Sequence, residues 1–369
     1  MLYLLAELTA LKGDFFKLFQ VFDYITFRTG GAALTAFLLT VLLGPYTIKL
    51  LKSFRATAAC RYEGIMPEEF INHEKDKTPS MGGILIIGAV AVSTVLWAKM
   101  TNPVAVALLA STLSFSALGF VDDYAKVAHQ KRDGITPKMK MLWQTMTVLI
   151  ALIFLRAMPG DASVPVDAFY VPFLKTPLWV SPWTILIDMV VVIGASNAVN
   201  LTDGKDGLAT GCTIFSVGAY AIIAYLCGHV VFANYLFIPH IPSAGEALVF
   251  CGAIIGACGG FLWYNCYPAG MFMGDTGSLA LGGALGMLAV IVRQEILLAI
   301  IGGVFVMEAG SVMLQVPYFK LTHGKRIFLC TPIHHHFERK GWNETQLVVR
   351  FWILSGIFAL IGLATLKLR

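Results

Sequence analysis

Residue types that can do chemistry gather in four short segments, and the first, FVDDYAK at 120–126, ends an apolar run with two carboxylates. Adjacent residues on a helix point about 100° apart. Asp122 and Asp123 therefore cannot easily bind one ion together, and we expect different roles for them, one facing the helix bundle and the other facing water. A solvated helix end is the simpler explanation of the pair taken alone. Lys126 lies within one turn of both and fits either a salt bridge or a phosphate contact.

The second segment, NAVNLTDGKDGLATG at 197–211, repeats amide and carboxylate side chains at every third position, so that neighbours in the series share a helix face. The series is Asn197, Asn200, Asp203 and Asp206. Gly204 and two further glycines free the backbone for the close approach of a phosphate or a ring. An ordinary turn needs only two or three such residues, so we favour a nucleotide-binding loop over a simple connection between two helices.

The third segment, GMFMGDTGSLALGG at 270–283, places Asp275 between two glycines at the start of an apolar run. Asp275 is accessible as an oxygen ligand for Mg²⁺, which typically takes one or two carboxylates together with substrate phosphates. It is equally suited to cap the N-terminus of a helix. On this segment alone, the cap is the favoured interpretation.

The fourth segment, TPIHHHFERKGWNE at 331–344, contains three of the eight histidines in a row, His334, His335 and His336. Zinc sites prefer histidines at wider helical spacings because adjacent side chains diverge, so a zinc hydrolase is disfavoured. Imidazoles that bind phosphates or move protons fit better. Lys75, in KDKTPSMGG, adds positive charge that is directed either at phosphate or simply at the cytoplasmic side of a membrane.

The elements that position these segments must be membrane helices. Of the 369 residues, 57% are hydrophobic and only 13% are charged, and the mean hydropathy is +0.74. A water-soluble domain cannot bury so much apolar surface. Disorder and nucleic-acid binding both need far more charge. The apolar runs are continuous rather than alternating, which excludes a β-barrel. The fold class predicted is therefore an all-α integral membrane protein.

Charge-free runs of about 20 residues predict ten transmembrane helices. Their ranges are 29–48, 78–98, 100–121, 141–155, 177–202, 207–227, 247–267, 276–292, 296–318 and 346–366. An even number places both termini on one side. The connections that carry the four segments contain 17 Lys and Arg residues, and the opposite set contains 9. The positive-inside rule then places both termini outside and one active site on the cytoplasmic face.

The chain is expected to form a single polytopic domain over 1–369. Residues 1–28 mix acidic and basic side chains with bulky apolar ones, which predicts an interfacial segment before a ten-helix core over 29–369. The seven cysteines form no CxxC pair, so neither a disulfide framework nor a zinc knuckle is indicated.

Together the segments FVDDYAK, NAVNLTDGxDGL, GMFMGDTGSLALGG and PIHHHFExKGWxE resemble the signature segments of the phospho-N-acetylmuramoyl-pentapeptide transferase family. This family is a branch of the polyprenyl-phosphate N-acetylhexosamine-1-phosphate transferases. The aspartate segments are common to that superfamily, whereas PIHHHFE points to the muramoyl branch. The resemblance runs from about residue 28 to the end of the chain, in the family's order.

The resemblance implies a multi-pass enzyme of the bacterial inner membrane that uses Mg²⁺. The implied reaction transfers phospho-MurNAc-pentapeptide from UDP-MurNAc-pentapeptide to undecaprenyl phosphate, which forms lipid I and releases UMP in peptidoglycan synthesis. It implies ten membrane helices with both ends outside, and a homodimer. No nucleic-acid partner is expected.

The resemblance also assigns roles position by position. Asp122 and Asp123 match the catalytic pair, Asp275 matches the magnesium carboxylate, and the three histidines match a catalytic motif. The positions that match the nucleoside and diphosphate site are Asn200, Asp203, Gly204, Asp206, Asn265, Phe272 and Gln315. The basic residues beside that site are Lys75, Lys126 and Lys138.

Two departures from the family pattern stand out, Lys205 in place of the usual Leu and Ser80 in place of Thr. Ser80 keeps the hydroxyl. Lys205 adds a charge at the nucleoside pocket, unless its side chain reaches solvent or a substrate phosphate.

Direct displacement is the preferred mechanism, because the second pKa of a phosphate monoester, near 6, demands little from a base. A two-step route through a phospho-aspartate remains open. A UDP-GlcNAc:polyprenyl-phosphate transferase and a lipid-carrier transporter are the alternative functions. Glu308 and Gln315 share a helix face in the ninth predicted span, where they either extend the site or join helices by hydrogen bonds.

Overall fold

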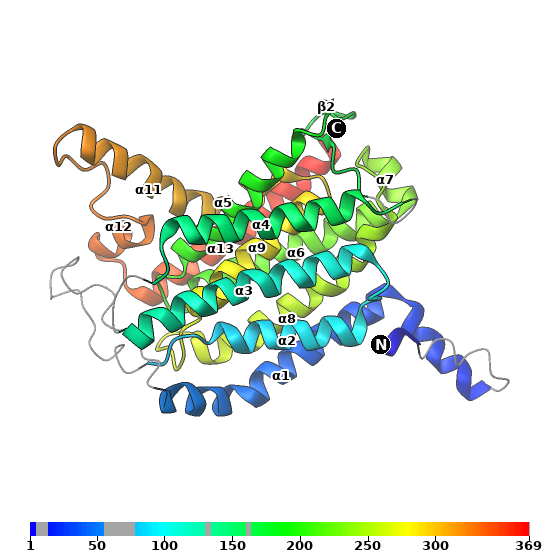
Figure 1. The fold of residues 1–369 in the computed structure, drawn as a ribbon, viewed down its shortest axis with the longest axis horizontal. Coiled ribbons are helices and arrows are strands. Elements are labelled where there is room, and N and C mark those ends of the chain that lie inside the picture. Colours follow the sequence, from blue (N-terminus) through cyan, green and yellow to red (C-terminus); the bar gives the residue numbers. More distant parts are fainter. Residues whose placement is uncertain (5–13, 55–77, 130–133, 160–163, 369) are drawn as a thin grey trace.

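The computed structural model describes residues 1–4, 14–54, 78–129, 134–159 and 164–368. Lys75 and residues 5–13 of the predicted interfacial segment lie outside the described residues, so those two expectations stay predictions. In Figure 1 the long helices run side by side, with α12 (Ile333–Arg339) at one end of the bundle and both chain termini toward the other.

The described part of the chain is almost entirely helical, which confirms the all-α prediction. The long helices are α1 (Ile25–Ser53), α2 (Gly83–Trp97), α3 (Pro103–His129), α4 (Pro137–Arg156), α5 (Thr184–Thr202), α6 (Leu208–Gly228), α8 (Ala247–Asn265), α9 (Gly274–Ile291), α11 (Gly303–Leu321) and α13 (Glu344–Thr365). The short elements are η2 (Asp14–Asp23), β1 (Ala168–Phe169), β2 (Trp179–Val180), α7 (Val230–Leu236), η6 (Pro242–Glu246), α10 (Glu295–Ile301), α12 and η7 (Leu366–Leu368). The two short strands β1 and β2 pair antiparallel within the connection between α4 and α5.

Within the described residues, eight helices are long and apolar enough to span a membrane, and α10 with α11 forms a ninth that bends by 89°. The remaining predicted span, 78–98, corresponds to α2, which has only 15 residues. It is short because the chain before it is extended and pairs with the residues before α9. The backbone N–H groups of Gly82 and Gly83 donate to the carbonyls of Phe272 and Met273, each at 2.8 Å.

Local sequence explains where several helices begin. Thr136 precedes α4 and its hydroxyl accepts from the Met139 backbone N–H, while Pro137 occupies the first helical position. Asn343 caps α13 in the same way.

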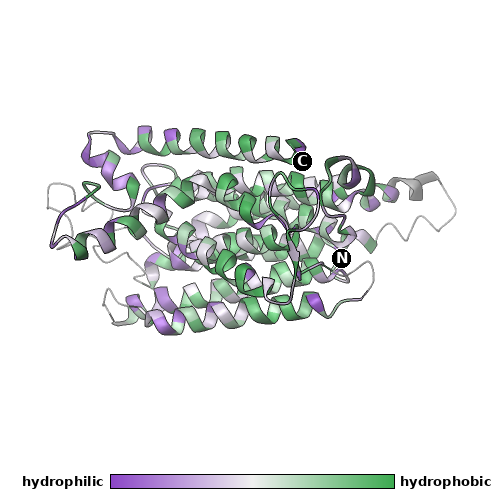
Figure 2. Ribbon diagram, turned by 90° about the horizontal axis from the view of Figure 1, so that it is seen from above, coloured by the Kyte–Doolittle hydropathy of each residue, from purple (hydrophilic) through white to green (hydrophobic). Residues whose placement is uncertain are grey.

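Figure 2 shows hydrophobic residues along the bodies of the helices and hydrophilic residues mainly toward their ends. This distribution is that of helices in a bilayer, with the polar chemistry confined to the helix ends.

Helix α9 is the centre of the bundle. All 18 of its residues are buried, and α3 and α5 pack along it. Glycine, alanine and serine make up much of its sequence, which allows close approach of neighbouring helices. Its N-terminus therefore lies inside the protein, at the end of the bundle where α3 ends and α4 begins.

Candidate functional site

Three buried carboxylates meet where the end of α3 contacts the start of α9. Asp122 and Asp123 come from α3, and Asp275 comes from α9. One oxygen of each lies within 4.8 Å of one oxygen of each of the others. Such a set of hard oxygen donors suits a divalent cation, so the predicted trio does come together in space.

Asp123 serves the N-terminus of α9. Its Oδ1 accepts from the Asp275 backbone N–H at 3.2 Å, and its Oδ2 accepts from the Thr276 N–H at 2.9 Å and the Thr276 hydroxyl at 2.7 Å. A carboxylate at this place satisfies free helical N–H groups and complements the helix dipole. Gly274 has a φ of +73°, and a Cβ there would lie 2.7 Å from Asp123 Oδ2, so a glycine is needed for this close approach.

Asp122 and Asp275 are bridged by two lysines. Lys126 Nζ lies 2.6 Å from Asp122 Oδ2 and 2.9 Å from Asp275 Oδ2, and Lys140 Nζ lies 2.8 Å and 3.3 Å from the same two atoms. Asn200, from α5, donates to Asp275 Oδ1 at 2.9 Å. The cluster therefore combines carboxylates that can hold a cation with ammonium groups that can neutralise phosphate oxygens.

The structure corrects two interpretations of the acidic residues. Neither member of the α3 pair faces water, because Asp122 is 0% exposed and Asp123 is 6% exposed. Asp275 is not the cap of α9, since Met273 occupies the N-cap position and Asp275 already lies inside the helix. The two members of the pair make different contacts, because the lysines contact Asp122 whereas the α9 backbone contacts Asp123, and their different roles stay a prediction.

Lys140 belongs to the cluster, although the sequence alone assigned it no role in the site. The Thr136 cap was the available signal, because it starts α4 just before Lys140 and places that residue in the first turn, beside α3. Lys138, which the resemblance assigned to the site, is exposed on the same turn and is not among the residues that join the three carboxylates.

The histidine segment forms α12. It is held by a stripe of two residues on one face of α11, Glu308 and Gln315. His334 is buried, and its Nδ1 lies 2.9 Å from Glu308 Oε2. Gln315 Nε2 donates to the Phe328 carbonyl, and its Oε1 accepts from the Ile327 and Phe328 N–H groups. His336 Nδ1 accepts from the Leu329 N–H. The stripe therefore joins elements by hydrogen bonds, and Gln315 shapes the loop before α12.

His335 is linked to Lys205 through Glu338. Its Nδ1 lies 3.0 Å from Glu338 Oε2, and Glu338 Oε1 lies 2.5 Å from Lys205 Nζ. Burial and the nearby positive charges lower the pKa of His335 to about 4, against the raising effect of Glu338. Burial raises the pKa of Glu338, but His335 and Lys205 outweigh it and bring that pKa down to about 2. His335 is therefore a neutral imidazole near pH 7.

The loop between α5 and α6 connects the histidines with the carboxylate cluster. A Cβ on Gly204 would lie 2.5 Å from His334 Nε2, so only a glycine allows this approach. Asp206 Oδ2 accepts from the Ala269 N–H, and Asn265 Oδ1 accepts from the Gly207 N–H and the Thr210 hydroxyl.

The remaining predicted positions lie in the same region. Asp203 is the C-cap of α5, three residues after Asn200. Phe272 is half-buried beside the extended chain before α2, where its backbone N–H donates to the Pro79 carbonyl.

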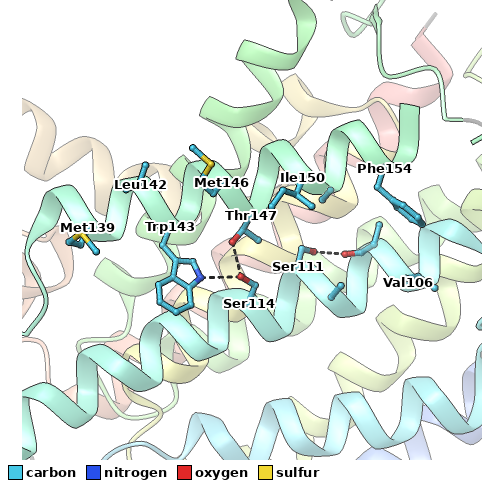
Figure 3. A pocket seen from close by; sticks show the side chains of 13 residues that line it. Val106, Ser111, Ser114, Met139, Leu142, Trp143, Met146, Thr147, Ile150 and Phe154 are labelled. Atoms are coloured by element: carbon cyan, nitrogen blue, oxygen red, sulfur yellow. Dashed lines mark hydrogen bonds between the residues drawn. The ribbon is translucent and has the colours of Figure 1, made fainter. Parts of the chain in front are cut away.

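An open apolar groove of about 570 Å³ lies between α3 and α4, and none of the residues that line it is titratable (Figure 3). Its hydroxyls are already bonded within the protein, because Ser114 Oγ lies 2.7 Å from Thr147 Oγ1 and accepts from Trp143 Nε1 at 3.1 Å. The groove therefore offers a hydrocarbon surface. Met139 lines its end next to Lys140, and Ser111 on its wall lies about three turns before Asp122 on the same face of α3.

Comparison with known proteins agrees with this geometry. The family model described as glycosyl transferase family 4 matches residues 104–293, and a phospho-N-acetylmuramoyl-pentapeptide-transferase signature matches residues 75–87. A phospho-N-acetylmuramoyl-pentapeptide-transferase of Desulfotalea psychrophila is 51% identical over 95% of this chain and 96% of its own length. One of Syntrophus aciditrophicus is 49% identical over 96% and 97%. The chain belongs to the phospho-N-acetylmuramoyl-pentapeptide-transferase family.

Proposed function

We propose that this protein transfers phospho-MurNAc-pentapeptide from UDP-MurNAc-pentapeptide to undecaprenyl phosphate, forming lipid I and releasing UMP. The observation that carries the proposal is the buried cluster of three carboxylates and two lysines at one end of a membrane helix bundle, in a chain of this family. Both substrates bring anionic phosphates. The three carboxylates outnumber the two ammonium groups, so a divalent cation held by the carboxylates is needed to offset the charge of the phosphates.

Mg²⁺ is the metal that the donor set fits best. The three carboxylates are hard oxygen ligands, and Asp275 and Asp122 already hold two ammonium cations between them. When bound, Mg²⁺ would neutralise the diphosphate and make UMP a better leaving group. We assign its binding to Asp275, with Asp122, which shares both lysines with it, as the further carboxylate.

The chain's own residues would position the reacting phosphates. Lys126 and Lys140 are only partly exposed, with 31% and 25% of their side chains accessible, and their charges are aimed into the cluster. Asn200 holds Asp275 by a hydrogen bond at its other oxygen. An oxygen of the bound diphosphate would accept the hydrogen bonds that the two lysines now donate to Asp122 and Asp275.

Asp122 is the better candidate of the pair for orienting the acceptor phosphate or removing its last proton. Both oxygens of Asp123 are engaged by α9, whereas only Oδ1 of Asp122 accepts from the backbone and its Oδ2 is held by the side chains of Lys126 and Lys140. Little deprotonating power is needed at a phosphate whose second pKa is near 6. These two considerations favour direct displacement over a phospho-aspartate intermediate.

The acceptor would bring its prenyl chain from the bilayer along the α3–α4 groove. The groove is apolar, its polar atoms need no outside partner, and its Met139 end adjoins Lys140. A prenyl chain lying there would present its terminal phosphate to the cluster. We further propose that the protein acts in the bacterial inner membrane with the cluster on the cytoplasmic face, and that it forms a homodimer.

The test is product formation by the purified protein with undecaprenyl phosphate and each of two donors. UDP-MurNAc-pentapeptide should yield a lipid-linked product and UMP, and UDP-GlcNAc should yield none. Activity with UDP-GlcNAc alone would replace our proposal by the related GlcNAc-1-phosphate transfer.

A lipid-carrier transporter is less well supported. It needs a path of charges through the membrane, yet the charged groups inside the described spans have local partners. Asp188 pairs with Arg293, Glu308 pairs with His334, and the Arg350 guanidinium stacks over the Trp342 ring.

A further inference from the structure

Lys205 departs from the family pattern, and the structure gives it a partner within the protein. It lies in the turn between α5 and α6, and its side chain is only 10% exposed. Its Nζ is 2.5 Å from Glu338 Oε1, on α12, which is 133 residues further along the chain. The lysine therefore joins the nucleotide-loop segment to the histidine segment instead of pointing into solvent.

Glu338 uses its two oxygens for two different segments. Oε1 takes the ammonium of Lys205, and Oε2 takes Nδ1 of His335 at 3.0 Å. His335 is 4% exposed, so its ring orientation depends on this contact and on its packing against the His334 ring, whose centroid is 4.1 Å away. With Nδ1–H donated to a carboxylate, the neutral ring presents Nε2 as an acceptor.

We propose that Lys205 is a positioning residue, which acts through Glu338 to fix the ring of His335 and to hold α12 against the α5–α6 turn. The proposal deepens the proposed function, because it concerns the same site. An apolar side chain at position 205 cannot orient Glu338.

The charges around His335 give the proposal a distinct signature. The titratable groups that face it are Lys205 from the α5–α6 turn and Glu338 and His334 from α12, and the positive charge of Lys205 lowers its pKa. Replacing Lys205 by a neutral residue removes that effect, while Glu338 remains ionised. The pKa of His335 should then rise above about 4, but burial, which is the largest cause of its lowering, remains and keeps it below the ordinary value.

The experiment compares Lys205→Met with Lys205→Arg, with Lys340→Met as the matched control. Lys340 is an exposed lysine just after α12 and contributes nothing to the Glu338 pair. For Lys205→Met we expect kcat to fall about tenfold, in line with the coupling of neighbouring charged groups. The acidic limb of the kcat–pH profile should move upward from near pH 4, because one of the positive charges that lower the pKa of His335 is removed. Arginine should restore both properties, and the control should match the parent protein.

A double-mutant cycle separates positioning from a general loss of structure. If Lys205 acts through Glu338, adding Lys205→Met to Glu338→Gln should cost little beyond Glu338→Gln alone. Additive losses, or an acidic limb that does not move, would overturn the proposal. Lys205→Gln provides a second neutral variant if the methionine variant does not fold.

A readout without the reaction keeps this proposal distinct from the transferase assignment. The pKa of His335 can be measured by NMR of protein with ¹⁵N-labelled histidine in nanodiscs, with the signal assigned by His335→Gln. A higher pKa in Lys205→Met supports the proposal even if UDP-MurNAc-pentapeptide is not the substrate. An unchanged pKa refutes it even if lipid I is formed.

Discussion

Replacing Asp275 by asparagine tests the centre of the site with almost no change in shape. Asparagine keeps an acceptor for Asn200 at the Oδ1 position but places an amide NH₂ opposite Lys126 and Lys140. Both lysines keep Asp122, at 2.6 and 2.8 Å. Each lost ion pair involves a partly exposed lysine, so it should cost only about 0.2–1 kcal/mol of stability.

The expected loss of activity is much larger than this structural cost. Asp275 is the carboxylate that we assign to Mg²⁺, and losing one electrostatic stabiliser of a transition state typically lowers kcat about 10²–10³-fold. That factor corresponds to roughly 3–4 kcal/mol. The assay is formation of lipid-linked product from radiolabelled UDP-MurNAc-pentapeptide over a range of Mg²⁺ concentrations, with thermal unfolding in detergent measured in parallel.

A matched control exists in the α4–α5 connection. Asp167 forms an ion pair with Arg156 at 3.1 Å, and both side chains are well exposed. Asp167→Asn therefore breaks an ion pair by the same substitution without touching the cluster, and it should leave kcat unchanged. Normal turnover of Asp275→Asn at ordinary Mg²⁺ would refute the metal assignment, and partial recovery at high Mg²⁺ would support it.

Three further predictions concern topology, stability and the groove. In a cysteine-free background, a cysteine at Lys340 should be labelled only from the cytoplasmic side and one at His240 only from outside, and the reverse pattern would place the site on the wrong face. Arg293→Met should lower stability by about 3–5 kcal/mol, because it leaves two buried carboxylates without a counter-charge, and an unchanged melting temperature in detergent would contradict this. Ala110→Trp fills the α3–α4 groove and should raise KM for undecaprenyl phosphate but not for a short-chain prenyl phosphate. The control Val190→Trp, on the exposed face of α5, should change neither KM. Equal effects of Ala110→Trp on both acceptors would exclude the groove as the site of the prenyl chain.

The helices could be predicted from the sequence because each apolar run carries its own signal. The boundaries that failed are those that depend on distant partners. The range 78–98 reads as one span, but its first residues pair with the backbone near Phe272 and the helix begins only at Gly83. The ninth predicted span reads as continuous, but it bends at Gly302.

The site residues could be identified by type, but their roles depend on contacts across the fold. Asp123 reads like Asp122 in the sequence, and only the approach of α9, about 150 residues later, makes it a helix cap. Asp275 reads as a helix cap because it lies beside the first residue of α9. In the fold, Asp123 from α3 accepts the N–H groups that such a cap would take. Glu308 had two open interpretations, and its contact with His334 on α12 favours the one in which it joins elements by hydrogen bonds. Lys205 pairs with Glu338 on α12, a partner that none of its sequence interpretations included.

The complete burial of α9 has a consequence for how the membrane acts on this enzyme. A helix that touches lipid must tilt or shift when the bilayer becomes thinner or thicker. None of the 18 residues of α9 faces the lipid, so that adjustment falls on outer helices such as α1, α4 and α13. The carboxylate at the N-terminus of α9 is thereby insulated from bilayer thickness, while the α3–α4 groove, with one wall on an outer helix, is not. Lipid composition should therefore affect acceptor binding more than the geometry around Asp275.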